Sequence, residues 1–462
     1  MNFNKETLAL HGAYNFDTQR SISVPIYQNT AYNFENLDQA AARFNLQELG
    51  NIYSRIGNPT SDVLGQRLAN VEGGAFGIPV SSGMAACFYA LVNLASSGDN
   101  VAYSNKIYGG TQTLISHTLK NFGIEAREFD IDDLDSLEKV IDQNTKAIFF
   151  ESLSNPQIAI ADIEKITQIA KKHKIVSICD NTVATPFLLQ PFKHGVDVIV
   201  HSLSKYVSGQ GSALGGALIE RKDLNDLLKN NDRYKAFNTP DPSYHGLNLN
   251  TLDLPIFSIR VIITWLRDLG DRYKAFNTPD PSYHGLNLNT LDLPIFSIRV
   301  IITWLRDLGA SLAPQNAWLL LQGLETLAVR IEKHSQNAEK VANFLNSHPD
   351  IKGVNYPTLA SNAYHNLFKK YFDKNFASGL LSFEAKDYEH ARRICDKTQL
   401  FLLAANLGDS KSLIIHPAST THSQLSEEEL QKAGITKATI RLSIGLENSD
   451  DLIADLKQAI ES

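Results

Sequence analysis

Cysteine is scarce in this sequence. Only Cys87, Cys179 and Cys395 occur among 462 residues, and no two of them form a CxxC pair. A disulfide framework and a cysteine-based zinc site are therefore not expected, and no metal is predicted. Because reduced thiols are typical of the cytosol, we expect a cytoplasmic protein.

Long apolar runs and a strong charge of one sign are also lacking. No stretch reaches the roughly 18 uninterrupted apolar residues that a membrane-spanning helix needs, and the N-terminal MNFNKETLALHGAYNFD lacks the apolar core of a signal peptide. The net charge is −7 and no basic block appears. Neither a membrane nor nucleic acid is therefore expected as a partner. Apolar residues make up 43% of the chain, which is ordinary for a globular protein of two or three domains.

What the chain does contain is an exact tandem repeat. Residues 232–270 and 271–309 are identical at all 39 positions. A repeat-built interaction protein is one interpretation, but solenoids need about three or more units, so two identical copies argue against it. Each copy ends in the apolar run LPIFSIRVIITWLRDLG, which needs a core. We expect the surrounding domain to persist and the extra copy to pack poorly.

Short apolar runs alternate with helical stretches in the first half of the chain. FGIPV, NVAYS, KAIFFE, IVSICD, VDVIVHS and GGALIE are typical of strands, and GTQTLISHTLKNF and IEKITQIAKKH of helices. This alternation predicts a mainly parallel sheet with helices on both faces, which binds ligands at the carboxyl ends of its strands. From about Ala310 a long helix or a broken pair is expected, followed by a smaller α+β domain.

Lys205 lies directly after the strand-like run VDVIVHS. A lone lysine is usually a solvated surface residue. Here Ser202 and Ser204 could contact a phosphate beside the amine, and a desolvated lysine of lowered pKa suits Schiff-base chemistry. The glycines that follow are spaced G-x-G-x-x-x-G, one residue too long for a dinucleotide fingerprint, and they do not open a helix, so a Rossmann site is discounted.

Two other motifs complement the lysine. Gly83 and Met84, in SSGMAA, stand at a predicted strand-to-helix junction, where free amides could bind a phosphate, although a plain helix start is the alternative. Asp180 ends the run IVSICD and is either a helix cap or the partner of a pyridinium nitrogen. Together with Lys205, these motifs indicate a pyridoxal phosphate site.

The motifs also carry a family resemblance. YSRIGNPT, SSGMAA, IYGGT, ESLSNPQ, DNTVATP and HSLSKY resemble the Cys/Met metabolism family of fold-type I pyridoxal phosphate enzymes, over essentially the whole chain once one repeat copy is set aside. The resemblance implies an α/β transferase fold with a mainly parallel, seven-stranded-type sheet and a smaller C-terminal α+β domain. It divides the chain into an N-terminal arm (1–60), a large cofactor-binding domain (61–309) and a small domain (310–462). It also implies a homotetramer built from dimers that share active sites.

The resemblance implies a role for each matching residue. Lys205 would carry the cofactor and act as general base and acid, and Tyr108 would stack on the cofactor and assist proton transfer. Arg441, helped by Asn406, would hold the substrate carboxylate. The cofactor-binding residues that it implies are Tyr53 and Arg55 from a neighbouring subunit, Gly83, Met84, Tyr108, Asn155, Asp180, Thr182, Ser202, Ser204 and Lys205.

The stretches PDPSYHGL and NLGDSKSL resemble the sulfhydrylase branch of the family. That branch implies γ-substitution of O-acetyl-L-homoserine by sulfide or a small thiol, giving L-homocysteine or methionine and acetate. Use of O-succinylhomoserine, cystathionine γ-synthase or γ-lyase activity, and a cofactor-binding protein inactivated by the duplication are the alternatives. Gly109–Gly110 stand where γ-lyases tend to carry a cysteine, which argues against a methionine γ-lyase. Tyr244–His245, or equally Tyr283–His284, are expected near the mouth of the site.

Overall fold

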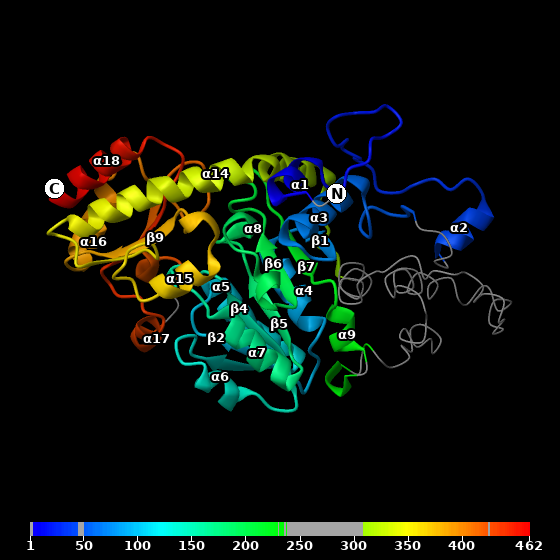
Figure 1. Ribbon diagram of the computed structural model, residues 1–462, viewed down its shortest axis with the longest axis horizontal. Helices are drawn as coiled ribbons and strands as arrows, with labels where there is room; N and C mark the ends of the chain where they lie inside the picture. Colours follow the sequence, from blue (N-terminus) through cyan, green and yellow to red (C-terminus); the bar gives the residue numbers. More distant parts are fainter. Residues whose placement is uncertain (1–2, 45–49, 230, 235–236, 238–307, 424–425) are drawn as a thin grey trace.

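The computed structural model describes residues 3–44, 50–229, 231–234, 237, 308–423 and 426–462. Within these residues the chain forms two β-sheets, a central one of seven strands and a C-terminal one of five, joined by a long helix that crosses above both (Figure 1). None of the helices in this part of the chain has the length and apolar content that a membrane crossing requires.

The central sheet has the strand order β1-β7-β6-β5-β4-β2-β3. Strand β7 pairs antiparallel with both of its neighbours, β1 and β6. All pairs from β6 across to β3 are parallel, so β7 is the one strand of this sheet that runs in the opposite direction. The predicted mainly parallel, seven-stranded sheet is confirmed. Its strands are β1 (Phe76–Val80), β2 (Asn100–Ser104), β3 (Glu125–Phe129), β4 (Thr145–Glu151), β5 (Val176–Asp180), β6 (Val198–Ser202) and β7 (Gly216–Glu220).

Both faces of this sheet are covered. In β4, Ile148 and Phe150 join one hydrophobic core, while Ala147 and Phe149 join another, because successive side chains of a strand point to opposite faces. Helices α3 (Pro59–Glu72), α7 (Ile163–His173) and α14 (Pro314–Ser347) contribute to the first core, and α4 (Gly83–Val92) and α9 (Leu224–Leu228) to the second. Shorter helices of this region are α5 (Gly109–Thr113), α6 (Asp135–Val140) and α8 (Thr185–Leu188).

The helix predicted over GTQTLISHTLKNF is irregular. After α5, Leu114–Thr118 forms a π-helical turn and Leu119–Phe122 a 3-10 turn. The Ser116 hydroxyl donates to the carbonyl of Gln112 at 2.7 Å, four residues back. Such back-bonding competes with the regular helical ladder, which accounts for the local departure.

The C-terminal part begins with α14 (Pro314–Ser347), a single helix of 34 residues. The five-stranded sheet that follows has the order β10-β11-β12-β9-β8 and is antiparallel except between β10 and β11. The predicted mixture of a long helix with further strands and helices is confirmed. The elements are β8 (Gly353–Asn355), α15 (His365–Tyr371), β9 (Leu380–Glu384), α16 (Tyr388–Lys397), β10 (Leu402–Leu403), β11 (Leu413–Ile415), α17 (Glu427–Lys432), β12 (Thr439–Ser443) and α18 (Ser449–Glu461).

The N-terminal segment contains two short helices. Helix α1 (Lys5–His11) packs against α3 and α14, whereas the stretch that carries α2 (Leu37–Phe44) lies away from both sheets (Figure 1). Several apolar side chains of this segment are exposed in the single chain, including Ile22 at 92% and Leu37 at 82%.

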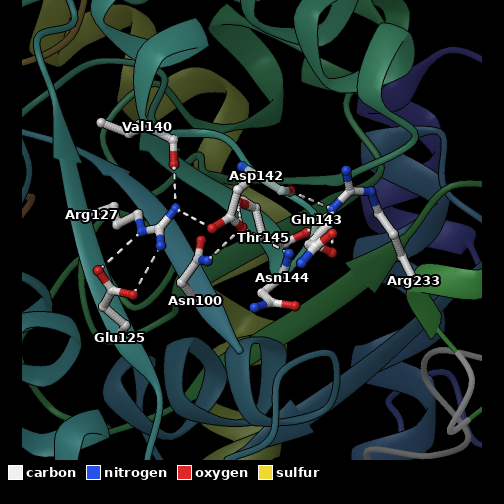
Figure 2. Close-up of polar contacts among 9 residues, drawn as sticks. All are labelled: Asn100, Glu125, Arg127, Val140, Asp142, Gln143, Asn144, Thr145 and Arg233. Atoms are coloured by element: carbon white, nitrogen blue, oxygen red, sulfur yellow. Dashed lines mark hydrogen bonds and ion pairs between the residues drawn. The ribbon is translucent and has the colours of Figure 1, made fainter. Parts of the chain in front are cut away.

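The two ends of the duplicated region are anchored in the central body. At the start of the first copy, Arg233 donates hydrogen bonds to the carbonyls of Asp142 (2.8 Å), Gln143 (3.0 Å) and Thr145 (2.9 Å), as Figure 2 shows. At the end of the second copy, the carbonyl of Gly309 accepts a hydrogen bond from the Tyr89 hydroxyl at 2.8 Å. The residues expected near the site mouth, Tyr244, His245, Tyr283 and His284, lie outside the described residues, as does the copy expected to pack poorly.

Candidate active site

Lys205 stands three residues after the end of β6, at the carboxyl edge of the central sheet. It is half-buried, and its Nζ donates a hydrogen bond to Oδ1 of Asn406 at 2.7 Å. Burial lowers the pKa of the Lys205 ammonium, and the nearby positive charge of Arg441 lowers it further. An amine with a lowered pKa reaches its neutral, nucleophilic form more readily than a surface lysine.

Asp180 ends the neighbouring strand β5, as its sequence position predicts. Its Oδ1 accepts a hydrogen bond from the backbone N–H of Thr182 at 2.9 Å. The Thr182 hydroxyl in turn accepts from the backbone N–H of Ser202 at 2.8 Å and so joins the end of β5 to the end of β6. Burial raises the pKa of the Asp180 carboxyl, while Thr182 and the charge of His201 oppose that rise.

A third element, the start of α4, lies against the end of β6. Helix α4 begins at Gly83 and is capped by Ser82, whose side chain accepts from the backbone N–H of Ala85. A Cβ at Gly83 would stand 2.6 Å from the Cβ of Ser202, so only glycine allows this close approach. The amides of Gly83 and Met84 therefore open beside the Ser202 side chain, in an arrangement that suits a phosphate group.

Ser204, predicted to contact the cofactor phosphate, is hydrogen-bonded to Gly215 in the structure. Its hydroxyl donates to the carbonyl of Gly215 at 3.2 Å and accepts from the N–H of the same residue at 3.0 Å. Since a serine hydroxyl has one proton to donate, Ser204 fastens the loop after Lys205 in this arrangement. Contact with a phosphate oxygen would require the proton to turn away from Gly215.

Of the two residues predicted to bind the substrate, Asn406 contacts Lys205 directly and Arg441 contacts Asn406. Arg441 lies in β12, is 4% exposed, and donates to the backbone carbonyl of Asn406 at 2.6 Å and to Oδ1 of Asn155 at 3.1 Å. Its Nε has no hydrogen-bond partner among the described residues. Burial lowers the pKa of the guanidinium to about 10, a value at which it still carries its charge at neutral pH. A buried cation with an open donor is suited to bind an anion.

Tyr108 stands just before α5 and is 42% exposed. Its backbone N–H donates to Oε1 of Glu151 at 2.7 Å. The other two predicted residues, Tyr53 and Arg55, lie on the N-terminal segment, where the Arg55 guanidinium is 5.5 Å from the Tyr53 ring centroid. Their reach into a neighbouring subunit stays a prediction.

Sequence reasoning missed two buried polar residues of this region. Glu151 ends β4 beside Asp180, and the signal that identified Asp180, a carboxylate closing an apolar strand, applies equally to it. His422 is 4% exposed, and its Nε2 lies 3.5 Å from where a Cβ of Gly109 would stand. Burial lowers the pKa of His422 to about 4, and Arg441 contributes to the shift. No local sequence pattern distinguishes this histidine.

The fold and the site together define a class of protein. A helix start that only glycine can form lies beside a serine, a half-buried lysine follows a strand end, and an aspartate ends the adjacent strand. Features of these kinds are what pyridoxal 5'-phosphate needs for its phosphate, its aldehyde and its pyridine nitrogen. The chain is a fold-type I enzyme that depends on pyridoxal 5'-phosphate.

Comparison with known proteins gives the family. The model of the Cys/Met metabolism PLP-dependent enzymes matches residues 6–461, and the chain belongs to this family. An O-acetyl-L-homoserine sulfhydrylase from Leptospira meyeri is 40% identical over 473 aligned residues, which cover 100% of this chain and 97% of the relative. A homocysteine synthase from Schizosaccharomyces pombe is 39% identical, with 99% and 98% covered.

A solved structure is also similar over its full length. It is described as an O-acetylhomoserine (thiol)-lyase from Campylobacter jejuni subsp. jejuni NCTC 11168 and is 90% identical, with a TM-score of 0.90 and 100% of both chains covered. That crystal structure contains N'-pyridoxyl-lysine-5'-monophosphate at position 205.

Proposed function

We propose that the protein catalyses γ-substitution of O-acetyl-L-homoserine by sulfide or a small thiol, releasing acetate and forming L-homocysteine or methionine. The names of the relatives, which cover nearly the whole chain, support this reaction. The observation that carries the proposal is the buried Arg441, whose open Nε lies in a hydrogen-bonded cluster with the lysine's own partner, Asn406. An amino acid substrate needs both an amine-exchanging lysine and a carboxylate site close to it.

The cofactor would be held by residues at the carboxyl edge of the sheet. The amides of Gly83 and Met84 and the hydroxyl of Ser202 would bind its phosphate, with Ser204 joining if its proton turns from Gly215. Asp180, kept in place by Thr182, would pair with the protonated ring nitrogen. When bound, the cofactor supplies an electron sink for charge that develops on the substrate.

The remaining roles in binding fall to residues around the ring. Tyr108 would stack on its face, and its half-exposed side chain could also pass a proton. Asn155 would lie near the 3-hydroxyl of the cofactor, although its Oδ1 now accepts from Arg441. Arg441 and Asn406 would bind the substrate carboxylate, with two donors of the guanidinium aimed at two oxygens.

Lys205 would carry out the proton transfers. Its lowered pKa favours the neutral amine, which can take the proton from Cα of the substrate and then move a proton at Cβ. Acetate would leave from Cγ and the sulfur nucleophile would add to that same carbon. Asn406, which now holds Nζ, would release it when the substrate carboxylate binds nearby.

The assembly, the domains and the compartment are part of the proposal. Exposed apolar residues on the arm of residues 1–60 support its packing on a neighbouring subunit, where Tyr53 and Arg55 would complete the phosphate site of a homotetramer made of dimers. The cofactor domain would extend over 61–309 and the small domain over 310–462. Three free, buried cysteines support a cytoplasmic location.

Purified protein loaded with pyridoxal 5'-phosphate tests the reaction directly. We expect homocysteine from O-acetyl-L-homoserine and sulfide, slower turnover of O-succinyl-L-homoserine, and little release of methanethiol from methionine, since Gly109–Gly110 stand where γ-lyases tend to carry a cysteine. The control is Arg441→Ala, which removes the carboxylate site and leaves Lys205 in place. Cofactor absorption without turnover of either ester would contradict the proposal and indicate inactivation by the duplicated segment.

A further inference from the structure

Glu151 is a buried carboxylate that none of the proposed steps uses. It is the last residue of β4, is 6% exposed, and lies opposite Asp180 in the parallel pairing of β4 with β5. Each of its oxygens accepts a hydrogen bond from a backbone amide. Oε1 accepts from Tyr108 at 2.7 Å, and Oε2 accepts from Asn155 at 3.3 Å.

The two amides belong to two different loops, one after β2 and one after β4. Tyr108 follows β2 and would stack on the cofactor ring. Asn155 follows β4 and uses its side chain to accept a hydrogen bond from Arg441. The carboxylate therefore fixes the backbone under the aromatic residue on one side and, through Asn155, the position of the carboxylate-binding arginine on the other.

A purely structural role does not require this residue type. Burying an acid next to Asp180 is costly, because the interior disfavours the charged form and the two carboxyls repel each other. Burial and the charge of Asp180 raise the pKa of Glu151 above its ordinary value, while the hydrogen bonds from the amides of Tyr108 and Asn155 oppose this rise and favour the ionised form with two acceptor oxygens. An apolar residue would close the strand at lower cost, and glutamine would offer one acceptor oxygen and turn its NH₂ group toward the second amide. Glutamate reaches both amides with an acceptor.

We propose that Glu151 is a positioning residue that sets the relative placement of Tyr108 and Arg441, an inference that rests on the proposed γ-substitution for its effect on turnover. Both of its side-chain oxygens accept from backbone amides, so it acts through the two residues that carry those amides. Its effect should therefore appear first in the two backbone amides and only then in substrate binding.

The test uses the full-length protein and the variant Glu151→Gln. Amide hydrogen exchange, measured without substrate, should become about tenfold faster at Tyr108 or Asn155, because one of the two hydrogen bonds is lost. The KM for the amino acid substrate should rise about tenfold, with a smaller change in kcat, since Arg441 is less well held. A changed near-ultraviolet circular dichroism of the bound cofactor should report the movement of the Tyr108 ring.

The matched control is Glu220→Gln. Glu220 is a fully buried carboxylate in β7 of the same sheet, paired with Val198 at the start of β6 and so at the edge away from the site. This variant should leave the exchange of Tyr108 and Asn155, the KM and the dichroism unchanged. If both variants lower only the thermal stability, with no difference in exchange or KM, the positioning role is overturned.

Two further measurements keep the inference testable. If Glu151→Gln fails to fold, Glu151→Asp keeps both acceptors on a shorter side chain and should show the same changes to a smaller extent. In a double-mutant cycle, Glu151→Gln and Asn155→Ala should be non-additive in KM, because the first acts through the second, and full additivity would overturn the proposal. Exchange and dichroism do not depend on turnover, so a protein that is inactive toward O-acetyl-L-homoserine would refute the proposed function and leave this inference standing.

Discussion

Replacing Tyr234 with phenylalanine tests how the duplicated region is attached to the fold. Tyr234 is the third residue of the first repeat copy and is 1% exposed. Its hydroxyl donates to the carbonyl of Lys146 at 2.7 Å and accepts from the N–H of Val176 at 2.7 Å. It therefore connects the start of the repeat to β4 and β5 at the same time.

The expected cost follows from these two contacts. Phenylalanine keeps the ring in place and removes the hydroxyl alone, so a buried N–H and a buried C=O each lose a partner. Each unsatisfied group costs about 1–3 kcal/mol. Two such groups would together cost about 2–6 kcal/mol, and local relaxation around them lowers that sum. Tyr234→Phe should therefore reduce the free energy of unfolding by about 2–4 kcal/mol.

The matched control is Tyr273→Phe. Tyr273 is the third residue of the second copy and has the same 39-residue sequence context. Because the two observed hydrogen bonds belong to Tyr234, we expect Tyr234→Phe to lower the stability more than Tyr273→Phe does. The assay is urea unfolding followed by circular dichroism, with both variants and the unmodified protein compared at one pH and one protein concentration.

Three outcomes would refute the reasoning. A large loss for Tyr273→Phe with none for Tyr234→Phe would mean that the start of the second copy occupies the attachment site. Small losses for both single variants and a large loss for the double variant would mean that either copy can occupy it. A small loss for the double variant would mean that the two hydrogen bonds contribute little to stability.

Other predictions concern the site and the pH dependence. Lys205→Ala should abolish the visible absorption of covalently bound cofactor and lower turnover by about a thousandfold or more. Arg441→Lys should raise the KM of the amino acid substrate about 10- to 100-fold, because a bidentate contact becomes a single one, and an unchanged KM would remove Arg441 from the carboxylate site. Burial lowers the pKa of His334 from 6.5 to about 4, while its Nδ1 donates to the carbonyl of Ile444 at 2.6 Å. Its contribution to stability is therefore complete above pH 6.5 and falls as the pH drops toward 4, by about 2.5 kcal/mol at pH 4.5. Unfolding midpoints of His334→Asn measured between pH 7.5 and 4.5 should show a correspondingly flatter dependence, and a profile parallel to that of the unmodified protein would contradict this.

The sequence predicts six of the seven strands of the central sheet because each of them is a short apolar run closed by a polar residue. It does not predict the edge strand β3, whose sequence EAREF is mostly charged. Asp180 and Ser202 lie at the ends of their strands, as their positions in IVSICD and VDVIVHS indicate. The same pattern places Lys205 at the edge where parallel strands present ligands. These features are local, and a few neighbouring residues are sufficient to fix them.

Contacts between distant residues are not encoded in any local pattern. Arg441 and Asn155 are 286 positions apart and meet only because two sheets bring β12 next to the end of β4. The bonding of Ser204 to Gly215 is missed for a related reason, since it depends on the path of a loop and not on the residue types in HSLSKY. Glu151 carries the same local signal as Asp180, because each is a carboxylate that closes an apolar strand.

The attachment points explain how a duplication can leave this fold intact. The region enters through Arg233 and Tyr234, at the edge of the sheet opposite Lys205, and returns through Gly309 to Tyr89 of α4. A chain with one copy would begin with the same residues, Asp232 onward, and end with the same Gly309, because deleting either copy gives one and the same sequence. Both attachments are therefore available whatever the length between them, and doubling a connecting length adds only about 0.6 kcal/mol of closure entropy. The site residues from β4, β5, β6 and β12 contact one another without using either attachment. A one-copy variant should for this reason keep the same cofactor affinity, and a changed affinity would show that the added residues reach the site.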